Sequence, residues 1–143
     1  MIAQTLTTSF KVQILTATHD FTPSTGDTFK LALYLPTADI GADTTVYTTS
    51  GEITDTGYTA GGITLTTIAP TSSGTTAYVS FETATFTGLV STSVAGGLIY
   101  NSSKSNKSVA VLYFGSTKTS TVANPLVITF PTASSTTAII RFP

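Results

Sequence analysis

The residues of this chain that could carry acid–base or metal chemistry are one histidine and seven carboxylates. His19 stands beside Asp20 in the segment Thr18-His19-Asp20-Phe21. A His–Asp neighbour pair often arises by chance, and a Ser-His-Asp triad is defined by its geometry rather than by sequence order. No Gly-x-Ser-x-Gly motif, which would mark a nucleophile elbow, occurs in the chain. We therefore expect His19 to have a capping or loop role.

The carboxylates are scattered through segments that look like turns. Glycoside hydrolysis needs two of them facing each other across a cleft, for which Glu52 with Asp55 and Asp39 with Asp43 are the candidate pairs. No loop has the Asp-x-Asp-x-Asp-Gly spacing of a calcium site, and there is no cysteine for thiol or zinc chemistry. We predict no catalytic residues, no cofactor and no metal. A hydrolase stays an alternative that would need two carboxylates, or His19 and a nucleophile, in one pocket. The acidic residues are Asp20, Asp27, Asp39, Asp43, Glu52, Asp55 and Glu82.

Charge and hydropathy argue against two classes of partner. Six basic residues and a net charge of −1 cannot neutralise a phosphate backbone, so we expect no nucleic acid. The close pair Lys104 and Lys107 is typical of a solvated hairpin turn. The longest apolar runs, residues 31–35 and 109–114, are far shorter than the roughly 20 residues of a membrane-spanning helix. The first residues have neither the basic start nor the apolar stretch of a secretory signal, so we expect synthesis and retention in a cytoplasm.

Threonine-rich alternation indicates the elements that must position these residues. Threonine occurs in repeated pairs, and its branched Cβ suits a pleated sheet better than a helix. The short spacing of alternating segments is typical of an all-β fold. We predict a single antiparallel β-sandwich domain spanning residues 1–143. The expected strands are residues 29–35, 44–49, 63–68, 77–81, 97–100, 109–114, 126–130 and 138–142.

The strands of the second half are apolar on both faces, which indicates central strands or strands covered by another element or another subunit. Residues 98–100 and 109–114 should pair as a hairpin. We expect nine residues to lie mostly in the core: Phe29, Leu31, Leu33, Val79, Phe81, Leu98, Val111, Ile128 and Ile140.

Only the start of the chain offers a helix. Leu6, Phe10 and Ile14 are four residues apart, and a nearby Thr7, Thr8 or Ser9 could cap the helix. The rival interpretation is a strand, because Phe10, Val12 and Ile14 also alternate. We favour a short helix before residue 20. Among the six tyrosines, Tyr58 lies in a glycine-rich loop and is a candidate protein-contact residue.

Four segments resemble a family of small structural proteins encoded by tailed bacteriophages: residues 29–34, 47–62, 96–103 and 109–115. The resemblance covers nearly the whole chain, and its motifs are framework strands and turns. Within the run 109–114 the family is expected to have Asp, whereas this chain has Tyr113. That departure makes the strand more prone to contact other proteins, so Tyr113 is the second candidate protein-contact residue.

The resemblance implies a virion structural protein without catalytic residues. Within that class we expect a capsid decoration or cement protein that binds the outside of the head and stabilises contacts between capsomers. Its partners would be the major capsid protein or other virion proteins, it would form a homo-oligomer, and it would be assembled into virions in the host cytoplasm. The alternatives are a neck, tail or fibre component, and a carbohydrate-binding or adhesin module.

Overall fold

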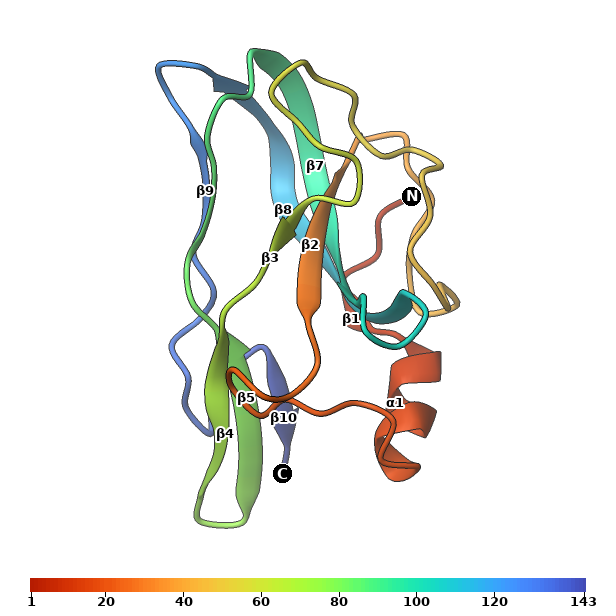
Figure 1. Ribbon diagram of the computed structural model, residues 1–143, viewed down its shortest axis with the longest axis vertical. Coiled ribbons are helices and arrows are strands. Elements are labelled where there is room, and N and C mark those ends of the chain that lie inside the picture. The colour runs from red at the N-terminus through yellow and green to blue at the C-terminus, as the bar shows by residue number, and fades with distance from the viewer.

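In the computed structural model the two longest strands, β7 (Ser91–Asn101) and β8 (Lys107–Thr121), form one antiparallel hairpin in the upper part of Figure 1. Its register places Leu98 opposite Val111, so the predicted pairing of residues 98–100 with 109–114 is confirmed. The structure describes residues 1–143, except for the side chain of Ser91. The other elements are β1 (Thr5–Leu6), α1 (Thr8–Leu15), β2 (Phe29–Tyr34), β3 (Ile63–Thr64), β4 (Thr67–Ser73), β5 (Thr76–Phe81), β6 (Ala84–Phe86), β9 (Leu126–Ile128) and β10 (Ile140–Phe142).

The hairpin is the centre of a sheet with the strand order β1-β8-β7-β2-β3, in which all pairings are antiparallel. Two smaller antiparallel sheets, β10-β5-β4 and β6-β9, lie beside it. These sheets packed together agree with the predicted β-sandwich. None of the described residues forms a helix with the length and apolarity that a membrane span requires.

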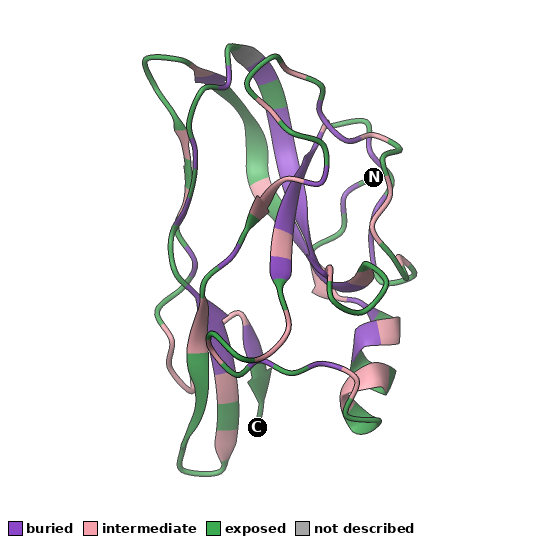
Figure 2. Ribbon diagram, viewed as in Figure 1, coloured by how far each residue is buried: buried purple, intermediate pink, exposed green. Residues whose placement is uncertain are grey.

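Both faces of the central sheet are covered by the chain itself. On β2, Leu31 and Leu33 face the main core, which includes residues of α1, β5, β6 and β10. The alternate residues Ala32 and Tyr34 belong to a second core with Ala38, Ile40, Leu98 and Val111. The second core lies under residues 36–62, the orange to yellow loop on the right of Figure 1. The two-faced apolar strands are therefore covered by another element of the same chain, and Figure 2 shows β2 and β7 largely buried.

The predicted N-terminal helix is present as α1, with Thr7 as its cap. The Thr7 hydroxyl accepts a hydrogen bond from the Phe10 amide, and Phe10 is fully buried against the sheet. Leu6 lies outside the helix, in β1. The exposed face of α1 includes Val12 and Leu15.

Three expectations need correction. Residues 44–49 form no extended strand, because their pairing is limited to one antiparallel bridge between Val46 and Lys107. The Tyr47 amide donates to the Asn106 carbonyl and the Ser108 amide to the Thr45 carbonyl at this bridge. Residues 63–68 divide between β3 and β4, since residues 63–64 pair with β2 whereas β4 pairs with β5. Ile128 is half-buried rather than in the core, because β9 pairs with β6 along one edge only. The other eight predicted core residues are buried.

Replacement of Leu33 tests the double-covered sheet. Leu33 is fully buried in the main core, so Leu33→Ala should lower the free energy of unfolding by about 2–5 kcal/mol in urea denaturation. Leu15→Ala is the matched control, since Leu15 is 85% exposed and alanine suits a helix. Equal stability of the two variants would contradict the packing described here.

Candidate functional site

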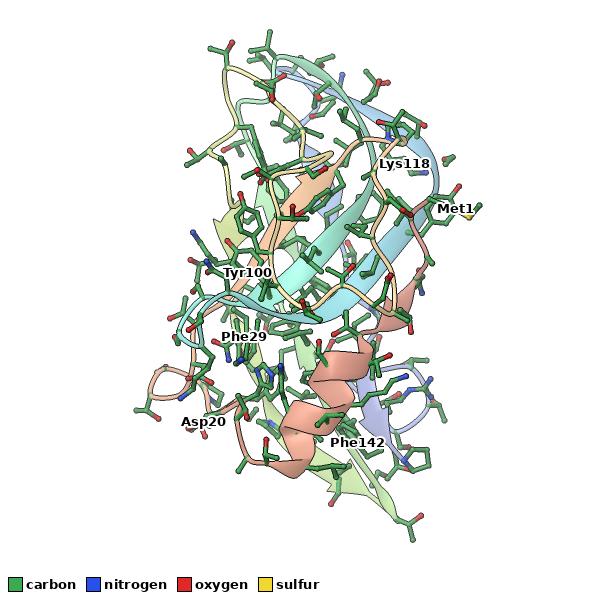
Figure 3. All side chains as sticks on the ribbon, turned by 90° about the vertical axis from the view of Figure 1, so that its right-hand side faces the viewer. Met1, Asp20, Phe29, Tyr100, Lys118 and Phe142 are labelled. Atoms are coloured by element: carbon green, nitrogen blue, oxygen red, sulfur yellow. The ribbon has the colours of Figure 1, made fainter. Side chains whose placement is uncertain are left out.

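The single histidine lies in the loop that follows α1, and it is buried. His19 is 8% exposed, with its ring packed against three phenylalanines from α1, the loop and β2. The centroid distances from His19 are 5.1 Å to Phe10, 6.4 Å to Phe21 and 6.4 Å to Phe29. Phe29 and Asp20, both labelled in Figure 3, mark this region beside α1. The ring therefore packs among three phenylalanine side chains.

Hydrogen bonds to Asn101 determine the protonation state of this ring. The Asn101 Nδ2 atom is 2.8 Å from the Asp27 carboxylate, and the Asn101 Oδ1 atom accepts from the Ser103 amide at 3.0 Å. Because a carboxylate only accepts and a backbone amide only donates, these two partners fix the orientation of the amide. The Asn101 NH2 group then donates to His19 Nδ1 at 3.0 Å. Nδ1 carries no proton, and the neutral ring donates from Nε2 to the Gln13 side-chain oxygen at 2.8 Å.

The surroundings of His19 lower its pKa from the ordinary value of 6.5. Burial is the largest cause, Lys107 and Lys104 act in the same direction, and Asp27 opposes them. Both ring nitrogens are hydrogen-bonded to side-chain amides, and neither of these bonds involves a hydroxyl nucleophile. The ring therefore joins segments of the chain, which agrees with a role in the loop.

A second polar cluster is centred on the buried carboxylate of Glu52. Its Oε2 atom accepts from the Tyr47 hydroxyl at 2.6 Å, and its Oε1 atom accepts from the Tyr58 hydroxyl at 2.7 Å and the Gly61 amide at 2.8 Å. The Tyr58 hydroxyl also accepts from the Leu33 amide of β2 at 3.0 Å. The carboxylate thus holds the loop 47–62 against the central sheet.

Further tyrosines close this cluster. The Tyr100 hydroxyl of β7 donates to the Gly61 carbonyl at 2.7 Å, and the Tyr47 ring stacks on Tyr100 at 4.8 Å. Gly61 has φ +89°, a conformation that favours glycine. Burial, followed by the hydrogen bond to Glu52, raises the pKa of Tyr47 and of Tyr58. The hydroxyls remain protonated donors at neutral pH.

This cluster contains two residues that the sequence analysis named as candidates, Tyr58 and Glu52. Tyr58 is half-buried with its hydroxyl bound inside the chain, while its ring stacks on Phe86. The other member of the predicted pair, Asp55, has partners outside this cluster, since one of its oxygens accepts from the amides of Gly57 and Val90. Sequence reasoning missed this cluster, although three of its members, Tyr47, Glu52 and Tyr58, stand close together in the chain.

Two further acids, Asp39 and Asp27, have cationic partners. Asp39 is exposed and binds the N-terminal amine at 2.7 Å, which lowers the pKa of its carboxyl group. Lys104 lies 3.6 Å from Asp27, so one of the two turn lysines has an acidic partner. Among the side chains that the structure describes, no group of three His, Cys, Asp or Glu residues could hold a metal ion.

The outer half of β8 is the third feature of interest. Between the pairs Val94–Lys118 and Gly96–Tyr113, β8 contributes residues 114–117 where β7 contributes only Ala95. This bulge and β9 line an open groove of ≈ 570 Å³, whose apolar walls include Phe114, Leu126 and Ile128. Lys118 is the one charged residue of the lining. Tyr113, just before the bulge, is 46% exposed.

Comparisons with known proteins identify no relative. No protein-family model matches the chain, and neither the curated proteins nor the solved structures contain a match.

Removal of the Glu52 carboxylate tests its role as an anchor. Glu52→Ala leaves the donors of Tyr47, Tyr58 and Gly61 without their shared acceptor, so we expect a stability loss of at least about 2 kcal/mol by chemical denaturation. Glu52→Gln should fall between this variant and the parent, since the amide keeps one acceptor oxygen.

The matched control is Glu82→Ala. Glu82 is exposed, and its replacement should change the stability by no more than about 0.5 kcal/mol. If the two alanine variants are equally stable, the Glu52 cluster does not anchor the loop.

Proposed function

We propose that this chain is a structural protein of a tailed-bacteriophage virion, and that it decorates the outside of the capsid. The viral part of this proposal rests on the sequence, whose framework strands and turns resemble those of small virion proteins. The fold adds a β-sandwich in which the buried side-chain nitrogen and oxygen atoms of the described residues are hydrogen-bonded within the chain. Such a subunit suits a role that depends on repeated protein contacts and no chemistry.

The observation that carries the proposal is the charge-poor surface around the outer half of β8, which combines apolar side chains with serine and threonine. Tyr113, Val122 and Val127 are 46%, 66% and 51% exposed, and Lys118 is the one charged residue in the groove lining. Met1 lines a neighbouring hollow with Tyr113 and Thr117, and Figure 3 shows Met1 and Lys118 on the same side of the molecule. Interface centres are poor in charge and rich in aromatic side chains, so this surface suits a contact with another protein.

The polar clusters support a structural role in a second way. Acid–base catalysis requires a titratable group within reach of a substrate. The ring nitrogens of His19 and the carboxylate oxygens of Glu52 instead bind donors and acceptors of the chain itself, and both residues are 8% exposed. Their interactions favour a scaffold over a hydrolase.

The alternatives receive less support from the surface. A carbohydrate-binding module would present coplanar exposed aromatic rings on one sheet face. The large exposed aromatic side chains of the described surface, Tyr113 and Phe142, belong to different sheets. A neck, tail or fibre component would use the same kind of contact surface, and copy number separates it from a capsid decoration protein.

Purified virions provide the test of location. In particles produced from the genome that encodes this chain, mass spectrometry should find it in a high, symmetry-related ratio to the major capsid protein. Particles lacking it should lose genome at lower temperature, because each contact is expected to bury on the order of 1,000 Å². Its absence from virions, or its presence in only a few copies at the tail, would overturn the decoration role.

A substitution at Tyr113 tests the contact surface. Tyr113→Lys should weaken binding to capsids that lack the protein by about tenfold or more, since it replaces an exposed aromatic anchor with a charge. Thr75→Lys is the control, because Thr75 is exposed in the turn between β4 and β5. Similar binding of both variants to the stripped capsids would place the contact elsewhere.

A further inference from the structure

We propose that His19 is a proton-sensitive latch that holds the end of α1 and the loop 16–28 against the end of the β7–β8 hairpin, and that acidification releases this region. The latch spans 82 residues of sequence between His19 and Asn101. It is independent of the proposed virion role.

Three segments meet at the His19 ring. Gln13 connects it to the last turn of α1, Asn101 connects it to the end of β7, and Asp27 connects Asn101 back to the loop. The start of α1 has its own attachment, because the Thr7 hydroxyl lies 2.9 Å from the Ser108 hydroxyl of β8. Release should therefore affect the end of α1 and the loop rather than the start of the helix.

A proton on Nδ1 is incompatible with this arrangement. It would turn Nδ1 into a donor facing the NH2 group of Asn101 at 3.0 Å. Asn101 cannot reverse its amide without turning its oxygen toward the Asp27 carboxylate and withdrawing the acceptor of the Ser103 amide. The charged ring must therefore leave its site, or lose several hydrogen bonds there.

The charges around the ring give the direction of the effect. Asp27 in the loop favours the charged ring, whereas Lys104 in the hairpin turn and Lys107 of β8 disfavour it. From α1 and β2 the ring meets Phe10, Gln13 and Phe29, which carry no charge. Burial is the largest influence, and it lowers the pKa of His19 below 6.5 in the closed state. A released ring regains its ordinary pKa, so the closed state is favoured above pH 6.5 and loses that advantage as the pH falls through the lowered pKa.

Because His19 is the only histidine, its imidazole signals in NMR are unambiguous. At pH 7.5 the ¹⁵N shifts should report the Nε2–H tautomer, and the titration midpoint should lie below 6.5. A midpoint at or above 6.5, or the opposite tautomer, would overturn the proposal.

Amide hydrogen exchange measures the release itself. After correction for intrinsic rates, the opening constants at Thr16, Ala17 and Thr18, whose amides bond to Gln13 and Ile14 carbonyls, should rise by up to about tenfold per pH unit below 6.5. The amides of Leu98 and Val111 should not follow this rise. His19→Gln should remove the pH dependence of the opening constants, even if that variant opens more readily at every pH. A flat profile in the parent, an unchanged slope in His19→Gln, or an equal rise throughout the sheet would each refute the latch.

Gln13→Glu tests whether the titration of His19 and the release of the loop change together, which a purely structural histidine does not require. The new carboxylate beside Nε2 favours the charged ring, so the titration midpoint of His19 should increase and acid release should weaken. Gln4→Glu makes the same change at an exposed position near Tyr113 and should leave the midpoint unchanged. Equal midpoints in both variants would contradict the latch geometry.

Discussion

The need to cover both faces of the β7–β8 hairpin is the constraint on which the rest of this structure depends. Leu98 and Val111 point to one side of the central sheet, while Ile99 and Leu112 point to the other. Apolar surface is favourable to bury at roughly 25 cal/mol per Å², so neither face can be left to water without a large loss. The smaller sheets and α1 cover one face, and the first part of the loop 36–62, with Ala38, Ile40 and Tyr47, covers the other.

Covering a sheet face with a loop brings polar backbone into the interior, and the two polar clusters meet that requirement. A buried amide or hydroxyl is costly unless it is hydrogen-bonded. Glu52 and its tyrosines satisfy the loop over the second core, and Asn101 with His19 and Asp27 satisfies the junction of α1, the loop 16–28 and the hairpin. His19 and Glu52, the residues that look most suited to chemistry, are therefore used in folding.

The surface that this arrangement leaves open gives the proposed function its physical basis. The outer half of β8 extends beyond β1, which pairs only with Ala110 and Val111. There the bulge, the groove beside β9 and Tyr113 are exposed with little charge. A structural subunit in a large assembly gains more from such a surface than a solitary enzyme would, because assembly removes apolar area from water.

Local pattern predicted the element types because it depends on neighbours in sequence. Alternation predicted β2, β5 and the hairpin of β7 and β8, and the four-residue spacing of Leu6, Phe10 and Ile14 predicted α1, although only the structure identified Thr7 as its cap and placed Leu6 in β1. Periodicity cannot show whether a short alternating segment finds a strand partner. For this reason residues 44–49 make a single bridge, between Val46 and Lys107, instead of a strand, and Ile128 is half-buried on an edge. The polar clusters could not be predicted from local pattern either, because their contacts join segments far apart in the chain. Glu52 is connected to Leu33 through Tyr58, and His19 is connected to Asn101. The residue types determined that the chain would form antiparallel sheets. Tertiary packing alone determined which face the loop covers and which carboxylate and imidazole are buried. Burial depends on how the layers assemble, and the sequence does not show this locally.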